Sequence, residues 1–366
     1  MSERHRFEVH APSRTYPVVV GPGVLADLPA LLAEVGLRGR LWLVADAAVA
    51  TRYAPRVVAG LRAAGYPVAV QTVPSGEESK SLAQAAALYD WLLAERVERG
   101  DALLALGGGV VGDLVGFVAA TILRGIAFVP LPTTVLAQVD ASIGGKVAVN
   151  HSRGKNLIGA FHQPCLVVAD TATLASLPPR ERAAGWAEVI KCGMILDAEL
   201  FALLEHEAEA LLGLAPAPTA AAIGRAMALK AAVVGEDERE SGRRAILNYG
   251  HTIGHALEAA THYARYLHGE AVAIGMVGAA SIAVELGVLP SEVAERQLRL
   301  LTRFGLPTRA SGVDVAAVRQ AMALDKKAAA GRLTWILPTA LGQVTLCREV
   351  PEEAVERALA RVLAPS

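Results

Sequence analysis

The chain has 366 residues, 53% of them hydrophobic and 19% charged, which is typical of a globular protein with two domains. A formal net charge of −1 and an aromatic content of 5% argue against a nucleic-acid partner and against binding to an anionic membrane surface. No apolar run looks long enough to span a bilayer, and the N-terminal MSERHRFEVH lacks the apolar core of a signal peptide. Isolated Cys165, Cys192 and Cys347 fit a reducing compartment. We therefore expect a cytoplasmic protein.

The first half of the chain alternates between strand-like and helix-like patterns, such as the helical run at 81–97. Several strand-like runs are continuously apolar, as in a parallel sheet that is covered on both faces. This alternation predicts an α/β domain with a doubly wound, mostly parallel sheet. The expected strands are YPVVVG (16–21), LWLVAD (41–46), VAVQTV (68–73), ALLALGG (102–108), IAFVPLP (126–132) and LVVAD (166–170).

The pattern changes after LPP (177–179), where helical runs follow one another. We therefore place a domain boundary near Leu177, with an α/β domain at 1–177 and a mainly helical domain at 178–366. TWILP (334–338) and QVTLC (343–347) are expected to form a small hairpin. The expected helical runs are 181–191, 202–212, 222–234 and 271–287.

Four of the nine histidines lie close together, at His251, His255, His262 and His268. His251 and His255 are four residues apart in a run that is typical of a helix, so both project from one face. Neutral imidazole is a common ligand of Zn²⁺. A single histidine is more often a hydrogen-bonded core or surface residue, but this density favours a metal site.

A glycine-rich turn stands out in ALGGGVVGDLVGF (105–117), where a buried strand runs into three glycines before a helix. Such a turn brings backbone amides close to a pyrophosphate at a helix N-terminus, although it could also be only a tight turn. Asp46 ends an earlier strand, where it could bind a ribose or cap the next helix. Glu77 and Lys80 lie in the loop SGEESKSL (75–82). Together these features predict a dinucleotide site.

Cationic and amide side chains beside glycines or within apolar runs form a third signal. A buried lysine needs a charged partner, which a phosphorylated, carboxylated substrate would supply. For any single residue a surface ion pair is the alternative. The set comprises Arg124, Lys146, Lys155, Asn156, Lys191, Lys230, Arg244 and the pair Lys326–Lys327.

These motifs give the chain a family resemblance. It resembles the 3-dehydroquinate synthases of the sugar phosphate cyclase family, and the match runs in order from about residue 46 to 331. The resemblance implies a Rossmann-like N-terminal domain and a helical metal-binding domain. The matching stretches are SGEESK, GGGVVGD, RGIAFVPLPTTVLAQVDASIGGK, GKNLIGAFHQP, WAEVIK, GRRAILNYGHTIGHALE, HGEAVAIGM and DKK.

The resemblance also implies an activity. The substrate would be 3-deoxy-D-arabino-heptulosonate 7-phosphate, and the products 3-dehydroquinate and phosphate, in the second step of the shikimate pathway. The route is transient oxidation by NAD, elimination of phosphate, reduction and intramolecular aldol cyclisation. The implied enzyme is thus a cyclising carbon–oxygen lyase with NAD and Zn²⁺, or Co²⁺, as cofactors. The family further implies a homodimer.

The resemblance assigns roles residue by residue. The metal ligands would be Glu188, His251 and His268, which moves His255 to acid/base chemistry or phosphate contact and His262 to the surface or to packing. Arg124 would contact phosphate across a dimer interface. The other catalytic or substrate-binding residues would be Asp140, Lys146, Lys155, Asn156, Lys191, Lys230, Arg244 and Asn248. The NAD-binding positions would be Asp46, Glu77, Lys80, Gly108, Gly109, Val110, Asp113, Thr133, Thr134, Lys146, Lys155 and Ser176.

The chain departs from the family pattern at Val147, Ser176 and Cys192, none of which is an implied metal ligand. Three alternatives remain open. Another sugar phosphate cyclase would share the metal and NAD sites but differ around Lys155, Asn156 and Lys230. A metal-dependent polyol dehydrogenase of the same fold would form NADH in net turnover. A non-catalytic zinc- and nucleotide-binding protein would not need so many cations directed at a substrate.

Overall fold

The computed structural model describes residues 3–328 and 333–364, apart from the side chains of residues 324–328 and 364. The chain forms two compact units. Unit 1 comprises Met1–Leu177 and Pro216–Arg239, and unit 2 comprises Pro178–Ala215 and Glu240–Ser366. The predicted anion-binding side chains of Lys326 and Lys327 lie outside the described part of the chain.

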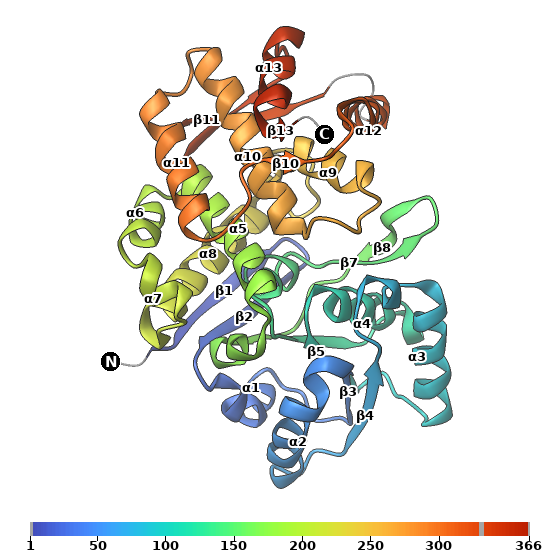
Figure 1. Cartoon of the computed structure of the whole chain (residues 1–366). Helices are drawn as coiled ribbons and strands as arrows, with labels where there is room; N and C mark the ends of the chain where they lie inside the picture. The colour runs from blue at the N-terminus through green and yellow to red at the C-terminus, as the bar shows by residue number, and fades with distance from the viewer. Residues whose placement is uncertain (1–2, 329–332, 365–366) are drawn as a thin grey trace. The chain divides into compact units, whose positions relative to one another are not determined.

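Unit 1 contains a four-stranded parallel sheet with the order β4-β3-β5-β6. Figure 1 labels three of these strands, β3, β4 and β5. The continuous apolar runs predicted these strands, and the structure confirms them. The chain first adds β4 beside β3 and then starts β5 on the other side of β3, so the direction of winding reverses between β3 and β5. In open α/β sheets, ligands bind at this switch point, beyond the carboxyl ends of the strands. The strands are β3 (Leu41–Asp46), β4 (Val68–Val73), β5 (Ala102–Gly107) and β6 (Ala127–Pro132).

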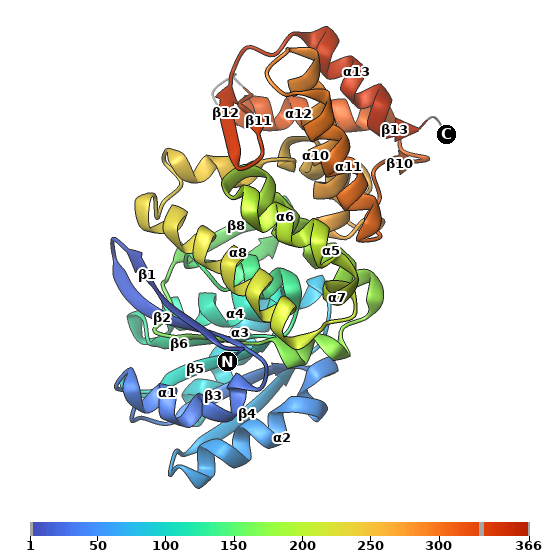
Figure 2. The same cartoon turned by 90° about the vertical axis from the view of Figure 1, so that its left-hand side faces the viewer.

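The two faces of this sheet have separate cores. Leu41 and Leu43 pack in the same cluster as residues of α1 (Leu28–Glu34) and α2 (Ala47–Ala63). Trp42 and Val44, which point the other way, pack with residues of α3 (Leu82–Ala94) and α4 (Gly109–Thr121). Figure 2 shows the two helix pairs on opposite sides of the sheet. Burial of both faces explains the apolar strands and confirms the doubly wound α/β class.

Two further β structures complete unit 1. In a three-stranded sheet, β2 (Arg14–Gly21) pairs antiparallel with β1 (His5–Ala11) and parallel with β9 (Val167–Asp170). The strands β7 (Lys146–His151) and β8 (Gly154–Phe161) form an antiparallel hairpin. Strands β2 and β9 were expected, whereas β1, β7 and β8 were not. Strands β1 and β8 are largely exposed, so they lack the continuous apolar signal.

Helix α8 (Pro216–Glu236) corrects the expected domain limits. The chain leaves unit 1 at Leu177, as expected, but the segment Pro216–Arg239 returns to it, so 178–366 is not one continuous domain. Helix α8 packs against β1 and β2, and a Cβ on Gly224 would lie 3.2 Å from the His5 ring. In β1 the exposed Glu8 and His10 alternate with the buried Val9 and Ala11.

Helix α8 also corrects the expectation that no apolar run has membrane-spanning length. It is long and apolar enough by composition, but 61% of its most apolar 18-residue window is buried. Burial against the β1–β2 sheet explains the apolar composition as that of a core helix.

Unit 2 is mainly helical, as expected. Its central helix is α10 (His268–Glu285), which packs against α5, α9, α11 and α13. A Cβ on Gly269 would lie 1.8 Å from the Ala184 carbonyl oxygen, and one on Gly275 would lie 1.9 Å from the Gly250 carbonyl oxygen. Only glycine allows these close approaches. The other helices are α5 (Pro179–Leu196), α6 (Ala198–His206), α7 (Ala208–Leu212), α9 (His251–Ala260), α11 (Ser291–Arg303), α12 (Val315–Ala328) and α13 (Glu352–Val362).

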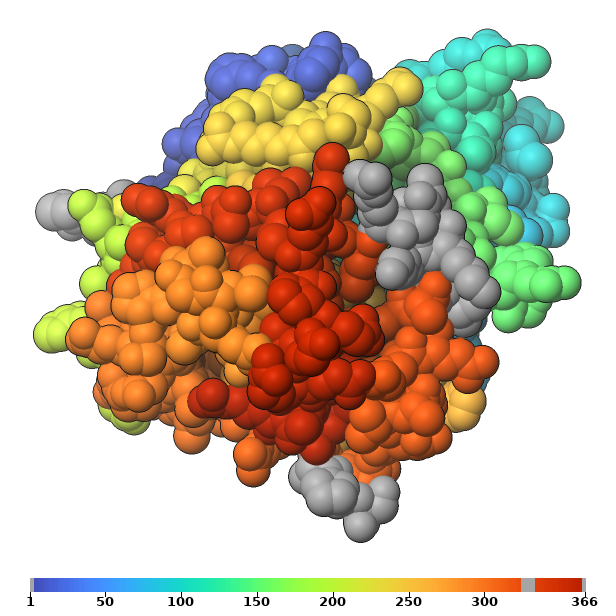
Figure 3. All heavy atoms as spheres, turned by 90° about the horizontal axis from the view of Figure 1, so that it is seen from above, coloured from blue at the N-terminus to red at the C-terminus, as the bar shows by residue number. Residues whose placement is uncertain are grey.

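The C-terminal part of unit 2 contains the expected hairpin. Strands β11 (Trp335–Ala340) and β12 (Gln343–Cys347) pair antiparallel. The short strands β10 (Ala310–Ser311) and β13 (Leu363–Ala364) pair in parallel. In Figure 3 the C-terminal segment, in red, lies against the orange segment that includes α11. Within the described residues no disulfide joins the three cysteines, of which Cys165 and Cys192 are buried.

Asp101 offers a test of how the amino-terminal ends of the central strands β3 and β5 are held. Its buried carboxylate accepts hydrogen bonds from Trp42 Nε1 at 2.9 Å and from the backbone amides of Arg40 and Glu98 at 3.0 and 2.9 Å. We expect Asp101→Ala to lower the free energy of unfolding by about 3 kcal/mol, because the buried indole N–H loses its acceptor. Urea denaturation measures this loss.

The control is Asp90→Ala, which removes an exposed carboxylate from α3. It should change the free energy of unfolding by less than about 0.5 kcal/mol. Equal stability of the two variants would contradict the role assigned to Asp101.

Candidate functional site

The carboxylate of Glu188 is the centre of the candidate metal site in unit 2. It lies on α5 and is only 2% exposed. Its Oε2 forms an ion pair with Lys191, one helical turn later. Its Oε1 is buried and has no hydrogen-bond partner in the described part of the chain. A buried carboxylate oxygen without a partner is costly, so a cation fits this position.

Two imidazole nitrogens face the same oxygen. His251 Nε2 lies 3.9 Å and His268 Nε2 lies 3.8 Å from Glu188 Oε1. Metal–ligand bonds of about 2.0–2.2 Å let a single ion contact two atoms that are up to about 4.2 Å apart. The ligand atoms of Glu188, His251 and His268 form one compact group. The structure thus brings together the three side chains that the sequence analysis named as ligands.

The histidine His251 is held in a form that can bind a metal. Its Nδ1 lies 3.0 Å from the Tyr249 carbonyl oxygen, so Nδ1–H donates there and the lone pair remains on Nε2. Burial lowers the pKa of His251 well below its usual value, and the positive charge of Lys191 and the neighbouring imidazoles lower it further. The ring is therefore neutral near pH 7, as a ligand must be.

His255 lies beside this group without belonging to it. Its ring centroid is 5.0 Å from that of His251, but its side chain is exposed. His255 instead forms a second possible group with Glu258 and His268. Neither group found among the described residues contains both His251 and His255, so the geometry gives no support to an i, i+4 metal pair. His262 is exposed in the turn after α9.

Other predicted residues of unit 2 lie on α5 and on the short 3-10 helix Arg243–Asn248, which precedes α9. Lys191 and Arg244 are buried, at 2% and 3% exposure. Asn248 is exposed and donates from Nδ2 to Glu240 Oε1 at 2.7 Å. Cys192 is buried, in agreement with a packing role.

The glycine turn of unit 1 lies at the switch point of the parallel sheet. Gly108 is the N-cap of α4 and makes no side-chain capping bond. A Cβ on Gly108 would lie 3.2 Å from Thr134 Cγ2, so a side chain here would crowd the turn. The amides of the first helical turn carry partial positive charge that favours an anion. This is the predicted position of a pyrophosphate.

Neighbouring strand ends bring other predicted cofactor residues to the same edge. The amide of Thr133 donates to the Gly107 carbonyl at 2.9 Å, which ties the end of β6 to that of β5. Asp46 ends β3 and caps α2 through Oδ1, which accepts from the Ala48 amide at 2.8 Å and from Ser75. The capping alternative for Asp46 is thus correct, and among the described residues its Oδ2 has no hydrogen-bond partner that would prevent ribose binding.

The loop after β4 joins this edge to the β7–β8 hairpin. Lys80 forms a buried ion pair with Asp113 of α4. Glu77 accepts from Asn150 Nδ2 at 2.8 Å and lies 3.7 Å from Lys155 Nζ. Lys80 therefore contacts α4, and Glu77 contacts the hairpin while remaining partly exposed.

Helix α8 brings Lys230 to Asp140, far away in the sequence. Lys230 Nζ forms an ion pair with the Asp140 carboxylate and donates to the Asp140 carbonyl at 2.6 Å. Asp140 lies in a π-helical turn, Ala137–Ala141, a distortion that is frequent at functional sites. This pairing gives Lys230, which lies within an apolar run of the sequence, the charged partner that a buried lysine needs.

The remaining predicted residues of unit 1 are more dispersed. Lys146 is exposed at the start of β7, and Asn156 is exposed with a positive φ of 59°. Arg124 is also exposed, with φ of 69° directly before Gly125. Val110 is half-buried in the first turn of α4, and Ser176 Oγ donates to the Thr173 carbonyl at 2.8 Å.

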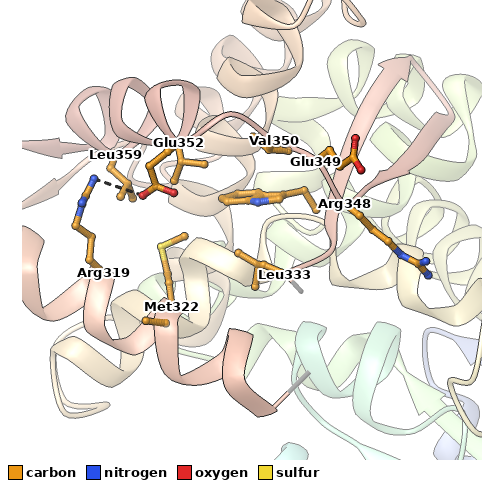
Figure 4. Close-up of a pocket in the computed structure, with 11 residues that line it drawn as sticks. Arg319, Met322, Leu333, Arg348, Glu349, Val350, Glu352 and Leu359 are labelled. Carbon is orange, nitrogen blue, oxygen red and sulfur yellow. Dashed lines mark ion pairs between the residues drawn. The ribbon is translucent and has the colours of Figure 1, made fainter. Parts of the chain in front are cut away.

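A separate cavity of about 530 Å³ lies in unit 2 between α12, β11 and α13. Figure 4 shows Met322 and Leu333 at this cavity and the ion pair of Arg319 with Glu352. Among the residues whose side chains the structure describes, no predicted site residue lines it. Because Arg319 is already paired with acidic residues of α13, the lining does not specify a ligand.

Sequence reasoning missed Glu258 and Tyr249, which contact the two histidines of the metal group. Glu258 Oε2 lies 3.3 Å from His268 Nδ1. Glu258 is seven residues after His251, so it lies on the same face of α9. An acidic residue on the apolar face of a helix beside two histidines was the signal that could have found it.

Comparison with known proteins agrees with this geometry. Residues 70–184 match the model of the 3-dehydroquinate synthase N-terminal region, and residues 185–328 match that of its C-terminal region. A 3-dehydroquinate synthase of Desulforamulus reducens is 48% identical and covers 94% of this chain and 97% of its own length. A 3-dehydroquinate synthase of Nostoc punctiforme is 49% identical and covers 96% of this chain and 98% of its own length.

Solved structures share the fold. The 2-epi-5-epi-valiolone synthase of Streptomyces hygroscopicus, solved with NAD⁺ and Zn²⁺, has a TM-score of 0.87 at 30% identity, with 94% of this chain and 95% of that chain covered. A 2-deoxy-scyllo-inosose synthase with carbaglucose-6-phosphate, NAD⁺ and Co²⁺ has a TM-score of 0.86 at 27% identity, with 97% and 99% covered. On the strength of the relatives in sequence and both regional matches, the chain belongs to the 3-dehydroquinate synthase family.

Proposed function

We propose that the protein is a 3-dehydroquinate synthase, which converts 3-deoxy-D-arabino-heptulosonate 7-phosphate to 3-dehydroquinate and phosphate. The observation that carries the proposal is the buried Glu188 Oε1, which has no hydrogen-bond partner among the described residues and faces Nε2 of two histidines. The sequence relatives with that name, at 48–49% identity over nearly the whole chain, support the same reaction.

We assign the metal to Glu188, His251 and His268. Two imidazoles and one carboxylate leave coordination positions open for oxygens of a substrate. Nitrogen and oxygen ligands suit both Zn²⁺ and Co²⁺, and related structures hold one or the other. The Lys191 ammonium forms an ion pair with Glu188 Oε2. The oxygen that does not face the histidines therefore has a partner of opposite charge.

We assign NAD⁺ to the carboxyl edge of the parallel sheet. The first turn of α4 after Gly108 would hold the pyrophosphate, and Asp46 Oδ2 would accept from a ribose hydroxyl. Lys80 and Asp113 would fix the loop after β4 through their buried ion pair. Related structures solved with NAD⁺ support this assignment.

The proposed reaction has no net redox change. When bound, NAD⁺ would accept a hydride from a ring carbinol and later return it, while the metal would lower the pKa of that hydroxyl. The temporary ketone acidifies the adjacent C–H, whose loss allows phosphate to leave. Ring opening and an intramolecular aldol step then form the new carbocycle.

The residues of the chain would mainly bind, orient and exchange protons. His255, one helical turn after His251 and exposed, can take or give a proton next to the metal group. Lys146, Lys155, Asn156, Lys191, Lys230, Arg244 and Asn248 would bind the carboxylate, hydroxyls and phosphate of the substrate. Asp140 would contact the reacting hydroxyls. Holding the substrate phosphate beside the acidic C–H would let the phosphate itself take the proton.

Two other enzymatic functions are less well supported. Cyclases that make other products are the structural relatives, but at 27–30% identity, below the 48–49% of the dehydroquinate synthases. A polyol dehydrogenase shares the fold, since a glycerol dehydrogenase structure is 19% identical with a TM-score of 0.59. That likeness concerns the fold alone. We further propose a cytoplasmic homodimer, to which Arg124 of each subunit contributes a phosphate contact.

Turnover gives the first test of this function. Purified protein with NAD⁺, metal and 3-deoxy-D-arabino-heptulosonate 7-phosphate should release inorganic phosphate with no net NADH, because the hydride is returned. Removing the metal with a chelator should abolish phosphate release, and adding Zn²⁺ or Co²⁺ should restore it. Net NADH formation from a polyol without phosphate release would instead support a dehydrogenase.

The metal assignment is tested by two histidine variants. His268→Ala removes a proposed ligand, so the purified variant should contain little metal. His255→Ala leaves the three ligands in place, so metal content should be unchanged while the rate falls by roughly 100-fold or more, as for loss of an acid/base group. Metal analysis together with phosphate release decides between these roles. Loss of metal from the His255 variant but not from the His268 variant would overturn the assignment.

A further inference from the structure

Glu258 is a buried carboxylate for which neither the family resemblance nor the proposed chemistry gives a role. It lies on α9 and is 5% exposed. Its Oε2 lies 3.3 Å from His268 Nδ1. Burying a carboxylate costs free energy unless its charge is compensated by strong hydrogen bonds. Its contact with the ring of a proposed ligand therefore requires an explanation.

The two nitrogens of His268 face different carboxylates. Nδ1 faces Glu258 Oε2 at 3.3 Å, and Nε2 faces Glu188 Oε1 at 3.8 Å. A neutral imidazole has one N–H donor and one lone pair. If Nδ1 carries the hydrogen and donates it to Glu258, the lone pair is on Nε2 and points to the side of Glu188.

His251 has the same arrangement with a different acceptor. Its Nδ1 faces the Tyr249 carbonyl at 3.0 Å, and its Nε2 faces Glu188 Oε1 at 3.9 Å. Both rings thus turn the same nitrogen towards one oxygen. A carboxylate acceptor differs from a carbonyl because its charge makes the ring a stronger electron donor to a metal.

The alternative is that Glu258 itself binds a metal together with His255 and His268. In that arrangement His268 would have to present Nδ1, the nitrogen that faces Glu258, and its Nε2 would face away from the ion. Glu188 Oε1 would then stay buried without a partner. The group with Glu188 satisfies this oxygen and uses the Nε2 atoms of both rings, so the geometry favours it.

We infer that Glu258 is a positioning residue that fixes the tautomer and orientation of His268 and thereby strengthens metal binding at Nε2. The inference deepens the proposed function, because it rests on the metal site of Glu188, His251 and His268. Glu258 touches neither substrate nor metal in this account and acts only through His268.

The tautomer can be measured without any metal. In metal-free protein labelled with ¹⁵N-histidine, at about pH 8 where an ordinary imidazole is neutral, NMR correlations between ring nitrogens and carbon-bound protons report which nitrogen carries the hydrogen. His268 should carry it on Nδ1 in the unaltered protein. In Glu258→Leu, which has no acceptor, the hydrogen should move largely to Nε2. A His268 that carries its hydrogen mainly on Nε2 in the unaltered protein would overturn the inference.

Metal affinity supplies the second readout. Glu258→Gln keeps the size and an acceptor oxygen but removes the charge, so we expect its affinity for Zn²⁺ to fall roughly 10- to 100-fold with one ion still bound. Competition with a chromogenic chelator measures the affinity. The matched control is Glu285→Gln, which neutralises a carboxylate on α10 that is paired with Arg357 and should leave the affinity unchanged.

The two readouts separate failure of the inference from failure of the proposed function. Unchanged Zn²⁺ affinity in both Glu258→Gln and Glu258→Leu would overturn the positioning role, even if the unaltered protein is an active synthase. Absence of metal binding by the unaltered protein would remove the proposed function and, with it, the effect of Glu258 on metal affinity. The coordination of bound Co²⁺, seen in its visible spectrum, should keep the same number of ligands in Glu258→Gln, whereas loss of a ligand would mean that Glu258 binds the metal itself.

Discussion

The environment of Glu188 is the constraint on which the candidate site of unit 2 depends. One carboxylate oxygen is neutralised by Lys191, and the other is buried without a partner while facing two imidazole nitrogens. Three helices must meet closely to produce this arrangement, and Gly269 and Gly275 of α10 allow backbone contacts that any side chain would prevent. The same close backbone contacts that pack the helices of unit 2 therefore also bring the proposed metal ligands together.

In unit 1 the topology of the parallel sheet places the candidate NAD-binding residues. The reversal of winding between β3 and β5 brings the end of one strand, with Asp46, beside the glycine turn at Gly108 that follows the other. The same sheet has a core on each face, so its rigidity comes from packing while its carboxyl edge remains available for loops. The buried Lys80–Asp113 ion pair and the contact of Lys230 with Asp140 then hold the surrounding segments.

Much of the fold could be predicted because continuous apolar strands and amphipathic helices are local signals. Strands β3, β5 and β6 are buried on both faces and were found, whereas β1 and β8 are largely exposed and were missed. The return of α8 to unit 1 depends on packing between distant segments, which no local pattern encodes. The density of histidines pointed to the candidate metal site, but proximity in sequence suggested the pair His251 and His255, which neither candidate group contains. The resemblance supplied Glu188, and Glu258 was missed because a single acidic residue on a helix usually faces solvent.

The position of the metal tests the central claim most directly. A crystal structure of the protein loaded with Zn²⁺, with anomalous scattering data collected at the zinc edge, would locate the ion independently of activity. The account predicts one peak within about 2.0–2.2 Å of Glu188 Oε1 and of the Nε2 atoms of His251 and His268, with His268 Nδ1 still facing Glu258. A peak bound by His255, Glu258 and His268 Nδ1, with Glu188 uncoordinated, would contradict it.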